Sequence, residues 1–299
     1  MRYGLCFPNF TSIASPDAID TAAATAERLG WDSVWTTDHV LVDTGPDAAG
    51  YRVNFDVIQT LAWVGARYPT IRLGTSVIVV PQRNAVVLAK ELASLDALSG
   101  GRVIAGIGVG WNEREFANLG VPDRFAVRGA YVEETIALWR HLWAGSGDPF
   151  DGRFNQMSDY AFGPLPTQVA GLPIWFGGRA DPALERAGRL ADGYHSSAAS
   201  PESFARRIPV IRSAAEAAGR PTPLLSARVR VAFDEPVRAA EPRPYAMRGA
   251  AENVAAEIAK FAELGVEHLA LFFEVDTAGA LVAAAERFDA EVRQASRPA

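Results

Sequence analysis

Short apolar, β-branched runs alternate with longer Ala-rich amphipathic stretches from one end of the sequence to the other. The short runs have the length and composition of buried strands, and the longer ones have the period of helices that bury one face. This alternation is typical of consecutive βα units. It predicts strands at 3–8, 33–36, 71–80, 102–108, 173–176, 193–197, 224–233 and 268–273.

Capping residues mark several helices between these strands. Ser15 followed by Pro16 is a favoured helix start, and Asn84 has the same role before the stretch 85–99. Asp181 is predicted to cap a helix whose first residue is Pro182. Further helices are predicted at 55–67, 131–143, 200–219 with a bend at Pro209, 251–265 and 278–293.

Eight consecutive βα units predict an α/β fold of the closed (β/α)8 type, the TIM barrel, as a single domain over residues 1–299. Two insertions break the rhythm: 144–171 in the fourth unit, and the charged, Pro-rich segment 234–248 after the seventh strand. We expect both to roof the pocket. The alternative is a Rossmann-like sheet with a second domain, although no Pro- or Ser-rich linker divides the chain.

Composition and charge argue against several classes of binding partner for this protein. The formal net charge is −6 and the chain has no run of basic residues, which argues against nucleic acid. No apolar stretch has the length of a membrane span, and the first residues lack the features of a signal peptide, so a cytoplasmic protein is expected. Cys6 is the only cysteine and the histidines are scattered, so we expect no internal disulfide and no metal site.

Gly106, Gly108 and Gly110 end the fourth predicted strand in the sequence IAGIGVGWNEREF. A dinucleotide-binding turn has the spacing G-x-G-x-x-G directly after a first strand, whereas these glycines have the spacing G-x-G-x-G well inside the chain. They lie instead at the face where barrel enzymes hold their active sites. Glycines there would let a ligand approach the backbone closely.

The carboxyl ends of the other predicted strands carry residues that a closed barrel would gather on one face. They are Asn9, Asp38, His39, Ser76, Val77, Gly177, Gly178, Arg179 and Ser197. His39 can act as a general acid or base, and Asp38 can hold its ring or contact a ligand. The alternative is a loop histidine beside an aspartate that caps a turn.

The turn at Gly177 and Gly178 opens a helix whose free amides could bind a phosphate. Arg179 could add a charge-assisted hydrogen bond, and Ser197 a hydroxyl from the next strand end. The alternative is an ordinary tight turn, which the negative charge of Asp181 favours.

Three further residues of interest follow Gly110 in the sequence. Trp111 could stack on or wall in a flat ligand, and the alternative is a tryptophan of the core. Glu113 and Glu115 are predicted to lie in solvent at a helix start, stabilised by the helix dipole. Neither the nucleophile motif G-x-S-x-G nor the phosphate-loop motif G-x-x-x-x-G-K-[ST] occurs in the chain.

A resemblance to a known family is carried by six stretches that are spread along nearly the whole chain. They are FPNF, GWDSVWTTDH, IRLGTSVIVVPQRNAVVLAKELASLDALSGGRV, GIGVGWNEREF, PIWFGGRADPALERAGRLADG and GVEHLALFF. Together they resemble the bacterial luciferase-like oxidoreductases. The block 71–116 is the most specific part. It is most similar to the branch that uses the deazaflavin coenzyme F-420 rather than FMN.

The resemblance implies a flavin-type ring at the carboxyl-terminal mouth of the barrel, beside a pocket for a small-molecule substrate. It implies a cis peptide bond between Ser76 and Val77 under the ring. It also implies that Asp38 and His39 lie beside the ring as catalytic residues, and His39 matches a histidine proposed as the base in a sugar-phosphate dehydrogenase of this group. By motif match, contacts to the backbone and phosphate of the cofactor fall on Val109, Gly110, Gly177, Gly178 and Ser197.

Two positions depart from the pattern of a sugar-phosphate dehydrogenase of this group. Trp111 stands where that enzyme has an acidic catalytic residue, so its sugar-phosphate chemistry is not expected here. Ser200 stands where a lysine helps to hold phosphate, which leaves Arg179 as a substitute.

Several functions stay open at this point. The first is hydride transfer between F-420 and a small organic substrate, and the second is an FMNH2-dependent monooxygenase. The third, of a different class, is a barrel that binds a flavin without catalysis. A hydrolase on the same barrel would bind neither flavin. Because relatives are often dimers, the resemblance also implies a homodimer.

Overall fold

The computed structural model describes residues 1–168, 171–234 and 245–294. Within these ranges, eight parallel strands close into a barrel in which β1 (Arg2–Cys6) pairs with both the second and the last strand. The predicted (β/α)8 barrel is confirmed, and the Rossmann-like alternative is wrong. In order around the barrel, the further strands are β2 (Ser33–Thr36), β3 (Arg72–Thr75), β5 (Val103–Gly108), β8 (Ile174–Phe176), β9 (Gly193–Ser197), β10 (Leu224–Phe233) and β12 (His268–Phe273).

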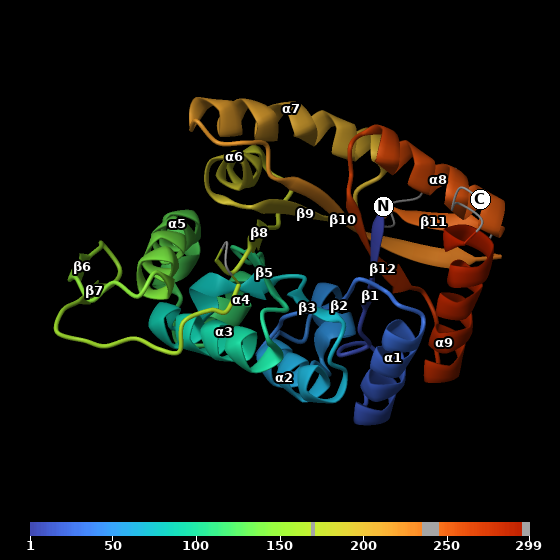
Figure 1. Cartoon of the computed structure of the whole chain (residues 1–299), viewed down its shortest axis with the longest axis horizontal. Helices are drawn as coiled ribbons and strands as arrows, with labels where there is room; N and C mark the ends of the chain where they lie inside the picture. Colours follow the sequence, from blue (N-terminus) through green and yellow to red (C-terminus); the bar gives the residue numbers. More distant parts are fainter. Residues whose placement is uncertain (169–170, 235–244, 295–299) are drawn as a thin grey trace.

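Helices cover the outside of the barrel, as Figure 1 shows. Those that follow the barrel strands are α1 (Pro16–Arg28), α2 (Val57–Arg67), α3 (Ala85–Ser99), α5 (Asp123–Trp143), α6 (Asp181–Leu190), α7 (Pro201–Ala217), α8 (Ala251–Glu263) and α9 (Ala278–Arg287). Shorter elements are η1 (Pro46–Tyr51), η2 (Val80–Gln82), α4 (Glu113–Asn118), β6 (Phe150–Asp151), β7 (Gln156–Met157) and η3 (Phe288–Arg293), a π-helical turn.

Two of the three predicted helix caps are confirmed. Ser15 accepts the Ala18 amide, and Asn84 accepts two amides of the first turn of α3. The predicted cap at Asp181 is wrong by one residue, because Ala180 still has an extended backbone and Asp181 is already the first helical residue. Ala180 has no side-chain acceptor, so no side chain caps the start of α6.

The third predicted strand is two strands in the structure. β3 ends at Thr75, and β4 (Ile78–Val79) resumes after a cis peptide bond between Ser76 and Val77, as the resemblance implied. This bulge lies against the glycines of β5. A Cβ on Gly106 would lie 1.7 Å from the Thr75 carbonyl oxygen, so the neighbouring strand, and not a ligand, requires a glycine there.

The first insertion is described over 144–168, and its return passes the amino-terminal end of the barrel. In Figure 1 its hairpin of β6 and β7 stands outside the barrel beside α5. On its return, Gln168 donates to the buried carboxylate of Asp96 and to the carbonyl of Val103, the first residue of β5, at 2.8 Å each. The expectation that this insertion roofs the pocket is wrong, because it connects a helix to a strand and only strand-to-helix connections reach the opposite face.

The second predicted insertion, 234–248, falls outside the described residues at 235–244. Its described end belongs to β11 (Ala246–Gly249), an additional strand that pairs in parallel with the end of β10. The expectation that this insertion covers the pocket stays a prediction.

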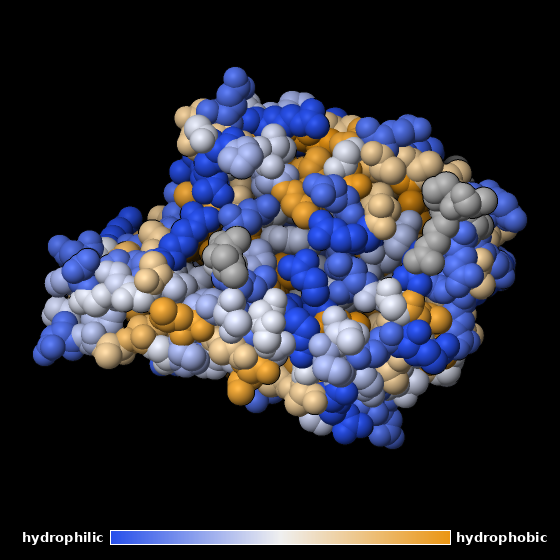
Figure 2. Space-filling model, viewed as in Figure 1, coloured by the Kyte–Doolittle hydropathy of each residue, from blue (hydrophilic) through white to orange (hydrophobic). Residues whose placement is uncertain are grey.

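The face in view is mostly hydrophilic, with hydrophobic side chains gathered over α3 and the neighbouring part of the first insertion (Figure 2). Leu98 of α3 and Leu165 of that insertion are among the exposed hydrophobic residues. In the described ranges, no helix combines the length and the apolar character that crossing a bilayer requires. The implied homodimer and the expected cellular location stay predictions.

We expect Gly106→Ala to lower the free energy of unfolding by at least about 3 kcal/mol, because the new methyl group collides with the backbone of β3. Urea denaturation measures this loss. Gly279→Ala in α9 is the matched control, since a Cβ there meets nothing within 4 Å and should be neutral or stabilise by up to about 1 kcal/mol. Equal unfolding midpoints for the two variants would contradict the contact.

Candidate functional site

The ends of distant strands meet around the bulge between β3 and β4. The methyl groups of Val77 would lie 2.7 Å from a Cβ on Gly108 and 3.0 Å from one on Gly177, so this residue touches both β5 and β8. The rings of His39 and Trp111 lie 5.8 Å apart, edge to face. The closed barrel therefore brings these predicted residues to one mouth. Ser76, Val109, Gly110 and Gly178 belong to the same strand ends.

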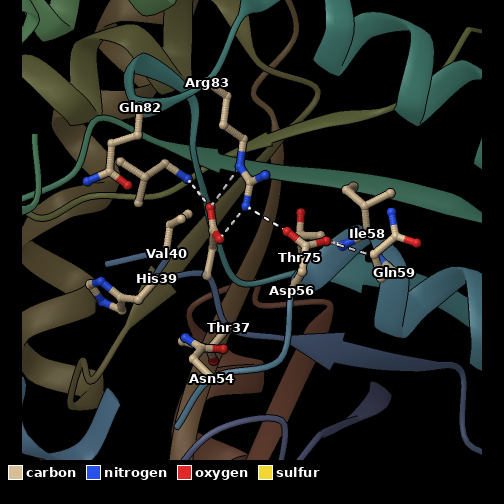
Figure 3. Close-up of polar contacts among 12 residues, drawn as sticks. Thr37, His39, Val40, Asn54, Asp56, Ile58, Gln59, Thr75, Gln82 and Arg83 are labelled. Carbon is tan, nitrogen blue, oxygen red and sulfur yellow. Dashed lines mark hydrogen bonds and ion pairs between the residues drawn. The ribbon is translucent and has the colours of Figure 1, made fainter. Parts of the chain in front are cut away.

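Asp38 is buried, and protein groups use both of its carboxylate oxygens. One oxygen accepts the Val79 amide at 3.0 Å, and the other pairs with Arg83 at 2.7 Å. Figure 3 shows the His39 side chain pointing away from this ion pair. The prediction that Asp38 holds the ring of His39 is therefore wrong, and Asp38 instead ties the end of β2 to β4.

The ring of His39 is held by Glu115, from α4. Nδ1 of His39 lies 2.9 Å from Oε2 of Glu115, which also accepts the Gln82 side-chain amide at 3.0 Å. The other carboxylate oxygen accepts the backbone amides of Val40 and Leu41 at 2.7 and 3.1 Å. The side chain of Glu115 is 1% exposed.

The prediction that Glu115 lies in solvent is wrong, whereas Glu113 is exposed as predicted. Asn112 caps α4 by accepting the Glu115 amide, which turns the third residue of this short helix toward the loop after β2. There the carboxylate meets two free backbone amides and an imidazole, and these replace its lost hydration.

The carboxylate of Glu115 sets which ring nitrogen of His39 donates a hydrogen bond. Burial alone would raise the pKa of Glu115, but hydrogen bonds from His39, Gln82 and the Val40 amide lower it to about 2. An ionised Glu115 accepts a hydrogen bond from Nδ1–H and so leaves the lone pair of a neutral imidazole on Nε2. Nε2 has no hydrogen-bond partner in the described part of the chain. His39 is thus arranged as a base with a free nitrogen.

The predicted phosphate site lies at the ends of β8 and β9. Arg179 and Ser197 are exposed, and neither side chain has a hydrogen-bond or ion-pair partner within the described ranges. They stand beside the start of α6, which no side chain caps. These are three kinds of donor for an anion at the ends of two paired strands, although the carboxylate of Asp181 belongs to the first turn of α6.

Two residues near this site have roles that the sequence analysis did not predict. Arg207 of α7 donates to Ser196 and, at 3.3 Å, to the hydroxyl of Tyr194, which adds a second cation that sequence reasoning missed. Ser200 caps α7 through the Ser203 amide at 3.2 Å. Ser200 therefore has a structural role as the cap of this helix.

Arg228, on β10, places a guanidinium group inside the mouth. It donates to the carbonyl oxygen of Ser76 at 3.2 Å and lies 5.4 Å from the ring centres of Phe10 and Phe272. Among the described residues no carboxylate pairs with it. Sequence reasoning missed Arg228, although the alternation RVRV placed two arginines at every second position of an otherwise apolar strand.

Asn9 does not face the mouth as a free polar group. It is fully buried, and its side-chain amide donates to the carbonyls of Thr37 and Phe55 and to the side chain of Asn54, at 2.8 to 3.1 Å. Asn9 therefore joins the loop after β1 to the loop after β2.

A cavity of about 550 Å³ opens at the ends of β1, β10 and β12. The cavity extends to His39, because Tyr51 lines it and the ring centre of Tyr51 lies 4.2 Å from that of His39. The rings of Phe10, Tyr51 and Phe272 line the cavity together with polar and charged groups, which include the ion pair of Arg230 and Glu274. In the described chain, no group of three or more His, Cys, Asp or Glu residues could hold a metal ion.

The sequence model of the family described as luciferase-like monooxygenase matches residues 1–298. The chain belongs to this family. It is 32% identical over 198 residues to a 5,10-methylenetetrahydromethanopterin reductase of Methanolobus tindarius, a match that covers 66% of this chain but only 55% of that protein. It is 31% identical over 238 residues to an F420-dependent glucose-6-phosphate dehydrogenase of Kineococcus radiotolerans, covering 76% of this chain and 67% of that one.

Two solved structures are similar to this protein over almost the whole chain. A coenzyme F420-dependent tetrahydromethanopterin reductase from Methanopyrus kandleri has a TM-score of 0.82 at 18% identity and covers 99% of both chains. The oxygenating constituent of 3,6-diketocamphane monooxygenase from Pseudomonas putida, in complex with FMN, has a TM-score of 0.77 at 16% identity and covers 98% of this chain and 97% of its own. At these identities the likeness shows the fold alone.

Glu115→Gln should lower the free energy of unfolding at neutral pH by roughly 3 kcal/mol, the energy of a pKa shift from 4.5 to about 2. Because the folded pKa is depressed, this stabilisation is present above about pH 4.5 and is lost as the pH falls toward 2. Urea unfolding at neutral and at acidic pH measures it.

Glu113→Gln, at the exposed neighbour, is the control and should change stability by less than about 0.5 kcal/mol at either pH. The difference between wild type and Glu115→Gln should shrink in acid. A difference that does not depend on pH would show that the charge of Glu115 is not its source.

Proposed function

We propose that this protein is an oxidoreductase that transfers hydride between coenzyme F-420 and a small organic substrate. The observation that carries the proposal is the buried pair of Glu115 and His39, which leaves Nε2 of His39 free beside Trp111 and the cavity that Tyr51 lines. Relatives above 30% identity are named as F420-dependent, which supports F-420.

The residues at the mouth fit a planar, anionic cofactor. Trp111 is 53% exposed and offers an aromatic face, while the guanidinium of Arg228 offers a positive charge that no carboxylate of the described chain neutralises. The start of α6 offers free donors to phosphate. We assign contacts with the ring to Ser76, Val77, Val109, Gly110 and Trp111, and contacts with phosphate to Gly177, Gly178, Arg179 and Ser197.

When bound, F-420 would supply the ring carbon that accepts or releases hydride. Nε2 of His39 accepts the proton of a substrate hydroxyl as its carbon becomes a carbonyl, and it returns this proton in the reverse direction. Glu115 stabilises the imidazolium that forms, since its carboxylate is already ionised and hydrogen-bonded to Nδ1. The cavity beside Tyr51 holds the rest of the substrate and limits the access of water.

Titration of the purified protein, followed by fluorescence, should show tighter binding of F-420 than of FMN. Arg179→Ala should weaken F-420 binding by roughly tenfold or more, because a charge-assisted hydrogen bond to phosphate is lost. Arg153→Ala, at an exposed arginine between β6 and β7, is the matched control and should bind like wild type. Tighter binding of FMN would favour the monooxygenase, and binding of neither would reject both.

His39→Asn should lower kcat for hydride transfer by about 10²- to 10⁴-fold, since the general base is lost, and leave F-420 binding nearly unchanged. A panel of alcohols and carbonyl compounds with oxidised and reduced F-420 provides the assay. His141→Asn, at the opposite end of the barrel beside Tyr160, is the control. Tight binding without turnover of any compound by the wild type would indicate a flavin-binding protein that is not an enzyme.

A further inference from the structure

A continuous row of polar side chains crosses the apolar interior of the barrel, from the mouth toward its amino-terminal end. Neighbouring groups in the row lie 2.8 to 2.9 Å apart. None of the residues is more than 7% exposed. We call the row the Ser–His chain, and its members in order are Ser76, His195, Ser226, His268, Ser33 and Trp35.

Both histidines of the Ser–His chain are neutral. Burial, together with the charge of Arg228, lowers the pKa of His195 to about 3. Burial and the positive charges around it lower the pKa of His268 well below its ordinary value. A neutral imidazole has one N–H donor and one acceptor nitrogen, so each of these histidines donates on one side and accepts on the other.

Trp35 sets the direction of the hydrogen bonds at the amino-terminal end. An indole N–H can only donate, and that of Trp35 donates to Oγ of Ser33 at 2.9 Å. The hydrogen of the Ser33 hydroxyl then has one acceptor in the described chain, Nε2 of His268 at 2.9 Å. His268 therefore carries its proton on Nδ1.

The position of this proton fixes the donors and acceptors of the remaining hydrogen bonds, from His268 to Ser76 at the mouth. Nδ1–H of His268 donates to Ser226 at 2.9 Å, and the Ser226 hydroxyl donates to Nδ1 of His195 at 2.8 Å. His195 must then carry its proton on Nε2, which donates to Oγ of Ser76 at 2.9 Å. Each hydroxyl and each ring nitrogen inside the row has a partner.

The opposite direction is less favourable. It would leave the buried hydroxyl hydrogen of Ser33 without an acceptor in the described chain, and an unmade hydrogen bond in an apolar interior is costly. The carboxylate of Asp32 would favour a proton on Nε2 of His268, but the two atoms are 3.8 Å apart, beyond hydrogen-bonding distance.

We propose that the Ser–His chain holds the hydroxyl of Ser76 as a hydrogen-bond donor toward a ligand in the mouth. Ser76 accepts from His195, so its own hydrogen has no acceptor among the described residues. The ligand it recognises carries a carbonyl oxygen or an unprotonated ring nitrogen at this position. That the ligand is a flavin-type ring rests on the proposed function, whereas the direction of the chain does not.

The tautomers can be read on the cofactor-free wild-type protein by NMR of ¹⁵N-labelled histidine. Variants assign the signals of His195 and His268: Ser226→Ala alters a partner of both, and Ser33→Ala alters a partner of His268 alone. We expect the proton on Nε2 of His195 and on Nδ1 of His268. Protons on the two opposite nitrogens would overturn the proposal.

Binding of F-420 tests the role of Ser76. Ser226→Ala breaks the Ser–His chain two members away from Ser76, and it should weaken F-420 binding by roughly three- to tenfold. Ser76→Ala should weaken binding by a similar factor. Because both variants remove the same hydrogen bond to the ligand, the double variant should bind F-420 no more weakly than either single variant. Wild-type binding by Ser226→Ala, or losses that multiply in the double variant, would overturn the proposal.

Two variants separate this role from a loss of folding. Ser226→Thr keeps the hydroxyl and should bind F-420 like wild type. Thr135→Val removes a buried hydroxyl of α5 that bonds only to the Tyr131 carbonyl, and it should leave binding and both tautomers unchanged. If the tautomers are as expected but the wild type does not bind F-420, the proposed function is wrong and the direction of the chain stands.

Discussion

The pairing of β1 with β12 is the constraint on which the other features depend. It runs from Arg2 opposite His268 to Leu5 opposite Leu271, and it joins the first strand of the barrel to the last. A closed barrel has no open edge between these strands, and all their carboxyl ends face the same way. Aromatic residues from the two ends of the chain, Phe10 and Phe272, can therefore line one cavity.

Buried carboxylates then fix the connections that closure has brought together. Glu115 bonds to the loop after β2, Asp38 bonds to the segment after β3, and Asp96 bonds to the returning end of the first insertion. In each case backbone amides of a distant segment replace the water that the carboxylate gave up. These ties set the positions of loops that have little regular structure of their own, and at the mouth they also set the orientation of His39.

Local pattern accounts for what could be predicted from the sequence. Periodicity locates the barrel strands, and the caps Ser15 and Asn84 locate helix starts, because both depend on residues within one turn. The convergence of His39, Ser76 and Gly177 follows from counting eight βα units, since the closed fold supplies the geometry.

The remaining features depend on partners that are remote in the sequence. Glu115 has the local pattern of a solvated helix start, and only the meeting of α4 with His39 buries it. Asp38 likewise looks like a partner for its neighbour until Arg83 is placed. The row through Ser226 could not be read from one strand, because each of its members is an isolated polar residue until the barrel closes.

The hairpin of β6 and β7 has a practical consequence. It stands outside the barrel beside α5 and belongs to a connection that runs past the start of β5, at the opposite end of that strand from the mouth. A fluorescent dye or a surface anchor attached there would leave the entrance to the barrel unobstructed. The protein could then be immobilised on a support with its open end directed toward the surrounding solution.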